Sequence, residues 1–282
     1  MSDTVFTMPG KLGDAIMQWP VAYQWAKAKG QTFTIWTDEK SVGKAKTLFE
    51  SQSCCDGVEF KPGIENYNCG GQPWHFGLET KDFQGKTVYH LGYRQFPERQ
   101  LTLESLEHAK LPMGIDKDRL SSEPSFDFPG AELLDLVVLH GQTICPHNRQ
   151  TPGFWKFISS IAGELEDEFD EVVFVGNESD REVGTRTYPE WSSFDDGGEF
   201  LNLAKFMNQS RLVIGCGSSC VALAGALKIA SVRVHDDIGG SSKTIWSNLG
   251  EAHVNESESD LRRSWPEFKA KWLSSSGAWI KA

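Results

Sequence analysis

The sequence lacks the long apolar run that a membrane-spanning helix requires. No stretch approaches the ~20 consecutive apolar residues needed to cross a bilayer. The opening residues, 1–4, also lack the basic and apolar regions of a secretory signal. From these absences we expect a cytoplasmic protein with no membrane span.

Cysteine is scarce, and its spacing has no regular pattern. The six cysteines stand at positions 54, 55, 69, 145, 216 and 220, and no C-x-x-C pair occurs. Neighbouring Cys54 and Cys55 do not suit one disulfide scaffold, and no spacing matches a zinc site. We therefore expect free thiols in a reducing compartment, and no metal site.

Positive charge is also in short supply. Lys and Arg number 28 against 39 Asp and Glu, which gives a net charge of −11. Such an excess of acid argues against broad binding to nucleic acid or to anionic membranes, although it leaves room for a local basic groove. At 282 residues with 39% hydrophobic side chains, the chain is long enough for roughly two domains with buried cores.

Several catalytic motifs are missing. The phosphate-binding G-x-x-x-x-G-K-[ST] and the hydrolase G-x-S-x-G do not occur. Asp116-Lys117-Asp118 has the form of a metal-binding D-x-D, but it does not follow a strand, so we interpret it as solvated. His140 and His147 flank Cys145 without a further ligand at metal spacing, so core or loop histidines are favoured.

What the sequence does contain is an alternation of strand and helix patterns. Thr4–Met8 predicts a strand, Gly10–Gly13 a loop, and Asp14 the start of a helix that Gly30 ends. Pro20 is expected to kink or restart that helix, because it lacks the backbone donor. Further strands are expected at 32–37, 57–60 and 87–91, helices at 41–49 and 101–111, and a long loop at 61–85.

The alternation begins again after a Pro-rich stretch, 112–132, that has the composition of an interdomain linker. Alternation on both sides of it predicts two doubly wound α/β domains, at 1–125 and 133–256, followed by a terminal helix within 257–282 that braces them. Strands are expected at 136–140, 172–175, 212–214 and 231–234, and helices at 154–165, 200–208, 218–227 and 258–273.

Ligands of open parallel sheets bind at the carboxyl ends of the strands, so the loops there matter most. Asp14 follows the first strand, and it is either a helix cap or a general base at a cleft; position alone favours the cap. The turn 215–219 is either a phosphate cradle or a plain tight turn, with neither favoured. Acids in 175–180 either bind ribose or are solvated, and the second is favoured.

Aromatic residues could also line a sugar site, since aromatic faces stack on sugars. The candidates are Trp74, His75, Phe76 and Tyr89, although such residues are more often simply buried.

Taken together, these loops resemble the ADP-heptose:lipopolysaccharide heptosyltransferase family, glycosyltransferase family 9. The first match is Gly13-Asp14, with Pro20 six residues later in an amphipathic helix. The resemblance implies a GT-B-like α/β fold, in which two Rossmann-like, doubly wound domains face a cleft. In that family the aspartate is the proposed catalytic base, so the resemblance assigns this role to Asp14.

The second half resembles the family's donor-binding domain. Leu139-His140-Gly141 and Arg149-Gln150-Thr151-Pro152 are similar to its strand end and K-x-W-P segment, which places Arg149 where a phosphate-binding lysine stands. The resemblance further implies donor or phosphate contacts from Gly13, Gly215, Gly217, Ser218 and Ser219, and nucleoside contacts from Gly176, Glu178 and Asp180.

The chain departs from the family at the donor loop. The family typically reads D-[ST]-G-P-x-H, whereas residues 217–222 here read GSSCVA. Ser218 is kept, but Gly217 replaces the acid and Ala222 replaces the histidine. These changes imply a donor other than ADP-heptose, or a weakened site.

The resemblance implies an inverting, metal-independent glycosyltransferase with no cofactor beyond its nucleotide-sugar co-substrate. The acceptor is expected to be a glycan or another hydroxyl, and nucleic acid only as an acceptor such as a modified phage DNA base, which the charge of −11 disfavours. Two alternatives remain open. One is a non-catalytic nucleotide or sugar binding protein, and the other is a related epimerase or nucleotide-sugar hydrolase.

Overall fold

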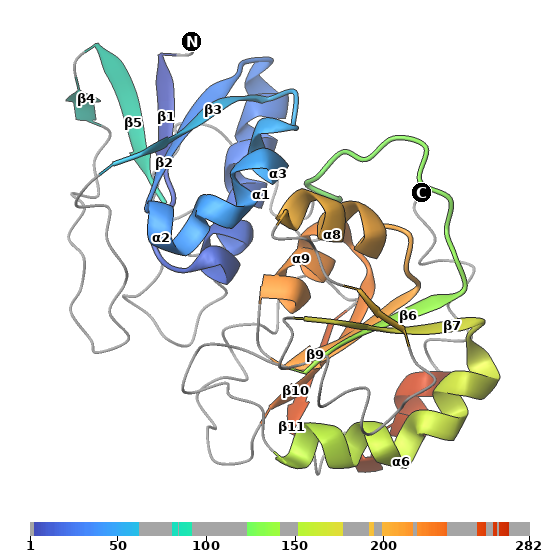
Figure 1. Cartoon of the computed structure of the whole chain (residues 1–282). Helices are drawn as coiled ribbons and strands as arrows, with labels where there is room; N and C mark the ends of the chain where they lie inside the picture. Colours follow the sequence, from blue (N-terminus) through green and yellow to red (C-terminus); the bar gives the residue numbers. More distant parts are fainter. Residues whose placement is uncertain are drawn as a thin grey trace. The chain divides into compact units, whose positions relative to one another are not determined.

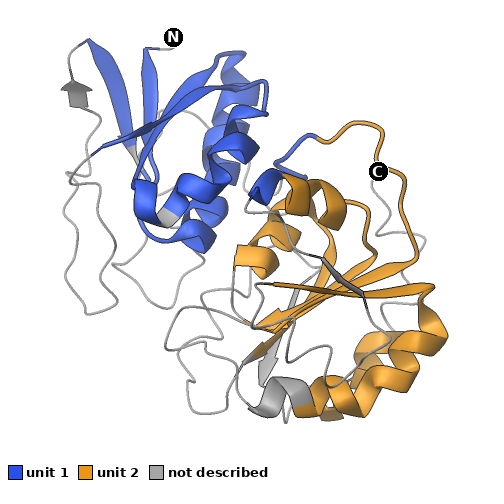
Figure 2. Cartoon of the chain, in the orientation of Figure 1, with its two compact units in different colours: residues 1–127, 199–201, 244–251 blue, residues 128–198, 202–243, 252–282 orange. Residues whose placement is uncertain are grey.

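The structure is a computed structural model of the chain. It describes residues 3–61, 81–83, 85–91, 123–141, 152–176, 192–194, 199–216, 219–235, 253–257, 262–263 and 265–270. The chain forms two units, shown in Figure 2: residues 1–127 with 199–201 and 244–251, and residues 128–198, 202–243 and 252–282. Over the described ranges, no helix has both the length and the apolar character needed to cross a bilayer.

The first unit contains a five-stranded sheet in the order β3-β2-β1-β5-β4 (Figure 1). Four strands are parallel, and β4 runs antiparallel to β5. The strands are β1 (Thr4–Thr7), β2 (Phe33–Thr37), β3 (Cys55–Phe60), β4 (Lys81–Phe83) and β5 (Lys86–His90). The helices are α1 (Leu12–Lys29), α2 (Glu39–Val42), a 3₁₀ turn (Gly43–Ala45) and α3 (Lys46–Glu50).

Helix α1 corrects one expectation and confirms another. Pro20 lies inside a continuous helix of 18 residues, so the helix does not restart there. The proline is buried among side chains that pack on the sheet, and this packing outweighs the backbone penalty of about 3 kcal/mol. Gly30 ends the helix as predicted: its φ is +63°, and its N–H donates to the carbonyl of Ala26.

Aromatic rings fill the space between α1 and the first sheet. The Phe6 ring lies 5.4 Å from Trp25, 5.1 Å from Phe33 and 5.3 Å from Tyr89, measured between centroids. Tyr89 is therefore a buried core residue, which confirms the interpretation favoured for it. Such edge-to-face and stacked pairs add to the apolar area that holds the helix in place.

Residues 123–127, which lie within the predicted linker 112–132, are packed into the first unit. The indole N–H of Trp19 donates to the Ser125 carbonyl at 2.6 Å. The Tyr23 hydroxyl donates to Asp127 at 2.9 Å, and burial together with this acceptor raises the pKa of Tyr23 above its ordinary value. The Asp127 N–H in turn donates to Gln52 at 2.7 Å. This segment therefore belongs to the core rather than to a loose connection.

The second unit contains six parallel strands in the order β11-β10-β9-β6-β7-β8. Numbered from β6, and read from β8, this is the order 3-2-1-4-5-6 of a Rossmann fold. The strands are β6 (Leu136–His140), β7 (Glu171–Val175), β8 (Ser192–Phe194), β9 (Leu212–Cys216), β10 (Ala230–His235) and β11 (His253–Ser257). Strands β8 and β11 were not expected from the sequence.

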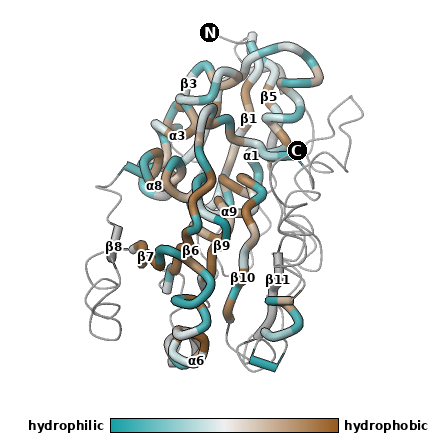
Figure 3. Tube along the Cα trace, turned by 90° about the vertical axis from the view of Figure 1, so that its right-hand side faces the viewer, coloured by the Kyte–Doolittle hydropathy of each residue, from teal (hydrophilic) through white to brown (hydrophobic). Residues whose placement is uncertain are grey.

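Helices cover both faces of this sheet. Figure 1 shows α6 (Pro152–Glu168) on one side and α8 (Phe200–Met207) and α9 (Ser219–Leu227) on the other. Strands β6 and β9 and helix α9 are largely apolar, whereas α6 has both apolar and polar positions (Figure 3). The sequence prediction of two doubly wound α/β sheets is confirmed by this topology.

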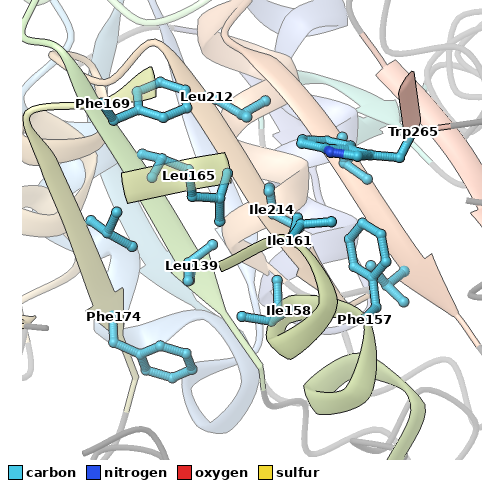
Figure 4. Close-up of a cluster of buried hydrophobic side chains, with 14 of the residues drawn as sticks. Leu139, Phe157, Ile158, Ile161, Leu165, Phe169, Phe174, Leu212, Ile214 and Trp265 are labelled. Carbon is cyan, nitrogen blue, oxygen red and sulfur yellow. The ribbon is translucent and has the colours of Figure 1, made fainter. Parts of the chain in front are cut away.

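The core under α6 includes part of the expected terminal helix. Phe157, Ile158 and Ile161 of α6 pack on alternate residues of the strands (Figure 4). Residues 262–263 and 265–270 are helical, and the buried Trp265 ring lies 5.9 Å from Phe157 in an edge-to-face arrangement. The described part of this helix therefore packs on α6 within the second unit.

Lys228 adopts a conformation that glycine normally occupies. It follows α9 with a φ of +59°, and its N–H donates to the Gly225 carbonyl at 3.2 Å. Left-handed backbone costs a lysine roughly 1 kcal/mol. Burial also lowers the pKa of its amine from 10.5 to about 8. Because the unfolded chain binds the proton between pH 8 and 10.5 and the folded chain does not, stability rises with pH across this interval.

We therefore expect Lys228→Gly to raise the free energy of unfolding, and more so at low pH. The gain should be about 1 kcal/mol at pH 10.5 and about 3 kcal/mol larger at pH 7, where the buried ammonium carries its full cost. Lys228→Ala is the matched control, since it removes the amine but keeps the backbone strain. Urea denaturation at both pH values separates the cost of the left-handed backbone from the cost of burying the charged amine. A gain in the free energy of unfolding that does not depend on pH would contradict the cost of burying the amine.

Candidate functional site

The loop after β1 is held in place from two directions. The Met8 N–H donates to the Trp36 carbonyl at 2.9 Å, and the Thr37 hydroxyl donates to the Met8 carbonyl at 2.7 Å. From α1, the side-chain amide of Gln18 donates to the Pro9 carbonyl at 2.8 Å. The backbone that leads into α1 is therefore fixed by β2 and by the helix itself.

Asp14 is the third residue of α1 rather than its first, because the helix begins at Leu12. Its Oδ2 accepts the backbone N–H of Lys11 at 2.8 Å, which satisfies a donor at the start of the helix. The capping role favoured by position is thus confirmed. A carboxylate has about four acceptor positions, so capping leaves it able to accept further hydrogen bonds. Asp14 is half-buried, as is Gly13 beside it.

Gly10 and Asp14 depend on one another. Gly10 has a φ of +99°, which favours glycine, and a Cβ at this position would lie 2.7 Å from both Cβ and Oδ2 of Asp14. Any side chain at position 10 would push the carboxylate away. The glycine therefore sets the position of Asp14, which the sequence alone did not indicate.

Asp14 lies at the switch point of the first sheet. The strand order turns back between β1 and β5, so the loop after β1 opens at the edge where ligands of doubly wound sheets bind. The end of β5 is tied to β1 there, since the Leu91 N–H donates to the Thr7 carbonyl at 3.1 Å. A carboxylate at such an edge is positioned to bind a hydroxyl or take its proton.

The switch point of the second sheet lies between β6 and β9. His140 of β6 pairs in register with Gly215 of β9. A Cβ on Gly215 would lie 2.9 Å from the His140 carbonyl oxygen and 3.1 Å from Cγ2 of Val221 in α9. Packing alone therefore explains a glycine at position 215, because its lack of a side chain lets α9 lie close against the two central strands.

His140 is fixed at this edge by its neighbouring strand. Its Nδ1 lies 2.9 Å from the Val175 carbonyl oxygen at the end of β7. Because a carbonyl only accepts, Nδ1 is the donor in this contact, and Nε2 is the ring nitrogen left for other partners. His140 is half-buried at the carboxyl end of the central strand β6, so it borders the ligand-binding end of the sheet rather than the core.

Two other predicted residues lie at the same edge of the sheet. Gly176 directly follows β7, and Ser219 is the first residue of α9; both are half-buried. The remaining predicted site residues lie outside the described residues: Arg149, Glu178, Asp180, Gly217 and Ser218. The same holds for Asp116, Asp118, Cys145, His147, Trp74, His75 and Phe76.

The described cysteines are free thiols, as predicted. Burial raises the pKa of the Cys54 thiol to about 11 and that of Cys55 to about 12, so both stay protonated near neutral pH. A protonated thiol is a poor nucleophile and a poor metal ligand. Within the described ranges, no group of three or more His, Cys, Asp or Glu side chains is placed to hold a metal ion.

Comparison with known proteins identifies the architecture. No protein-family model and no curated protein sequence matches the chain. Solved structures do: a glycosyl transferase family 9 protein from Veillonella parvula aligns at 14% identity over 94% of this chain and 88% of its own, with a TM-score of 0.60. The chain has a GT-B-type fold.

Two Escherichia coli structures support this GT-B assignment. ADP-heptose lps heptosyltransferase II aligns at 13% identity over 97% of this chain and 99% of its own, with a TM-score of 0.60. Heptosyltransferase WaaC with ADP aligns at 10% identity over 95% and 99%, with a TM-score of 0.65. The resemblance to glycosyltransferase family 9 is confirmed at the level of the fold.

The sequence analysis did not single out Arg233, which lies near the switch point of the second sheet. Arg233 lies in β10 and is only 2% exposed. Its signal is visible in the sequence as a charged residue between two valines of an apolar strand, Ser231 to Val234. Its relation to Gly215 required the register between strands, which the sequence alone does not supply.

Proposed function

We propose that the chain is an inverting, metal-independent glycosyltransferase that moves a sugar from a nucleotide-sugar to an acceptor hydroxyl. The observation that carries this proposal is the Rossmann order of the second sheet, with the N-terminus of α9 opening at its switch point. Helix N-termini bind phosphate groups through free backbone N–H groups. The WaaC structures, one with ADP and one with ADP-2-deoxy-2-fluoro heptose, support a nucleotide-sugar as the ligand class.

In this proposal the second unit binds the donor. The diphosphate is held by the turn after β9 and the start of α9, including Ser219, with Arg149 as a further cation. The nucleoside is held by the loop after β7, which begins at Gly176. The helix N-terminus then stabilises the negative charge that develops on the leaving nucleoside diphosphate, so no metal is required.

Asp14 takes the proton in the transfer step. The acceptor oxygen attacks the anomeric carbon while its proton passes to the Asp14 carboxylate, and the bond from that carbon to the diphosphate breaks. The nucleoside diphosphate leaves with the bonding electrons, and attack from the opposite face inverts the anomeric configuration. The acceptor is a glycan or another hydroxyl compound; we place nucleic acid second because the net charge is −11.

One observation favours a second candidate, a binding protein without transferase activity. Ala222 stands where the family has a donor-loop histidine, and it is fully buried in α9. It therefore offers no side chain to a donor. Such a protein would retain nucleotide or sugar binding but would not need Asp14 as a base.

A thermal-shift panel of nucleoside diphosphates and nucleotide-sugars tests the proposed donor site. A ligand at a hundredfold excess over its dissociation constant should stabilise the protein by about 3 kcal/mol. We expect one nucleotide-sugar to raise the melting temperature of the wild type and of Asp14→Asn equally. A shift without any sugar transfer would favour the binding protein, and no shift with any member would contradict a transferase with a preformed donor site.

A further inference from the structure

Gln18 is a buried amide that stands one helical turn after Asp14. Residues four apart lie on the same face of an α-helix, and long side chains in a helix point back toward its N-terminus. Gln18 has an exposed fraction of 0%, and its Nε2 donates to the Pro9 carbonyl at 2.8 Å. The side chain therefore joins α1 to the loop after β1, on the face of the helix that carries Asp14.

The hydrogen bond to Pro9 fixes which way the amide of Gln18 is turned. A carbonyl oxygen only accepts, so the nitrogen of the amide must face Pro9. The amide oxygen, Oε1, then has no hydrogen-bond partner among the residues that the structure describes. A buried acceptor without a partner costs free energy. Core stability is therefore an incomplete reason for a glutamine at position 18.

The Pro9 carbonyl belongs to the same planar peptide group as the N–H of Gly10. A hydrogen bond to its oxygen therefore fixes the peptide from which the φ rotation of Gly10 starts. That φ is +99°, and an unrestrained glycine adopts positive and negative φ about equally. Glycine gives the space that is needed at position 10, and the bond from Gln18 supplies the rigidity that glycine lacks.

The conformation of Gly10 in turn decides where the Asp14 carboxylate can lie. A Cβ on Gly10 would stand 2.7 Å from both Cβ and Oδ2 of Asp14, so the backbone of Gly10 packs directly beside the carboxylate. Oδ2 also accepts the Lys11 N–H at 2.8 Å. The carboxylate is thus placed by backbone atoms of a loop whose own conformation depends on Gln18.

We propose that Gln18 is a positioning residue for Asp14, which locks the Pro9–Gly10 peptide and so holds the carboxylate in place for the proton of the acceptor hydroxyl. This role rests on the function proposed above. A general base must come within about 3 Å of the oxygen whose proton it takes, and a misplacement of about 1 Å can cost a hundredfold in rate. Gln18 takes no proton itself and acts only through Asp14.

The test begins with Gln18→Met, whose side chain has nearly the same length but no N–H to donate. Turnover is measured with the nucleotide-sugar selected by the thermal-shift panel, and donor affinity by calorimetric titration. We expect kcat to fall by about tenfold to a hundredfold, the range expected for a misplaced catalytic group. The dissociation constant of the donor should stay within about twofold of the wild type, because the second unit binds the donor in the proposed function.

Gln24→Met is the matched control. Gln24 is a second buried glutamine of α1, 5% exposed, and its Nε2 donates to Glu123 at 3.2 Å rather than to the loop after β1. The substitution removes the same kind of hydrogen bond from the same helix. It should leave kcat within about twofold of the wild type, because it does not act on the Pro9–Gly10 peptide.

A double variant shows whether Gln18 acts through Asp14. In Asp14→Asn the proposed base is already lost, so adding Gln18→Met should lower kcat by less than about twofold more. A residue that only supports the fold would lower kcat by the same factor in both backgrounds. If Gln18→Met does not fold, as judged by circular dichroism, Gln18→Asn replaces it, because its amide is one methylene too short to keep the bond to Pro9.

The outcomes separate this inference from the proposed function. A wild type that transfers sugar, with a Gln18→Met variant that has full kcat, would overturn the role of Gln18 alone. Equal losses in the wild-type and Asp14→Asn backgrounds would identify Gln18 as a structural residue and overturn the inference too. A wild type that binds a nucleotide-sugar without transferring the sugar would overturn the proposed function, and the role of Gln18 with it.

Discussion

Replacing Trp19 by alanine should lower the free energy of unfolding of the first unit by about 3–5 kcal/mol. Trp19 is completely buried, and its ring stacks on Phe126 at a centroid distance of 5.2 Å. It also packs against Phe33 and Phe49 at 5.5 and 5.1 Å. Alanine leaves a cavity among these rings and removes one of the contacts that hold residues 123–127 against α1.

Two variants separate the causes of this loss. Trp19→Phe keeps an aromatic ring but removes the N–H that donates to the Ser125 carbonyl, and we expect a smaller cost of about 1–2 kcal/mol. Trp265→Ala makes the same change in the core of the second unit. Urea unfolding, followed by circular dichroism, should show the first unit destabilised by Trp19→Ala and the second by Trp265→Ala. A cost below 1 kcal/mol for Trp19→Ala would contradict the packing argument.

Strands β6, β7 and β9 were predictable because each contains a continuous apolar run. Leu136–His140 is bounded by Asp135 and by Gly141, and a strand buried on both faces has such an apolar run. Strands β4 and β8 have only three residues each, which is too short for a periodic signal. The restart of α1 expected at Pro20 does not occur, because a local rule cannot include the packing of a whole helix against a sheet.

The candidate site was predictable in its loops but not in its geometry. The sequence indicated that Asp14 follows the first strand, yet the distance from Gly10 to its carboxylate depends on a left-handed backbone. The row of His140, Gly215 and Arg233 joins strands that are far apart in the chain. Only the register between those strands reveals it, and register is a property of the assembled sheet.

The proposed role of Asp14 as a base leads to the largest expected effect on activity. Asp14→Asn should lower kcat for sugar transfer by about 10²–10⁴-fold, the range typical of a lost general base. The dissociation constant of the donor should not change, because the diphosphate and nucleoside are bound by the second unit. Turnover is measured with the nucleotide-sugar selected by the thermal-shift panel, and donor affinity by calorimetric titration.

The substitution is informative because it separates the base from the helix cap. In the wild type the Lys11 N–H lies 2.8 Å from Oδ2 of Asp14. Asparagine retains a side-chain oxygen that can accept this N–H, so α1 should remain capped, and the free energy of unfolding should change by less than about 1 kcal/mol. Asp14→Ala removes both functions and should lower stability as well as kcat. Asp56→Asn, an exposed carboxylate in the same unit, is the matched control and should leave kcat unchanged. If Asp14→Asn kept full activity while Asp14→Ala lost stability, Asp14 would be a helix cap only, and the base would have to be sought elsewhere in the chain.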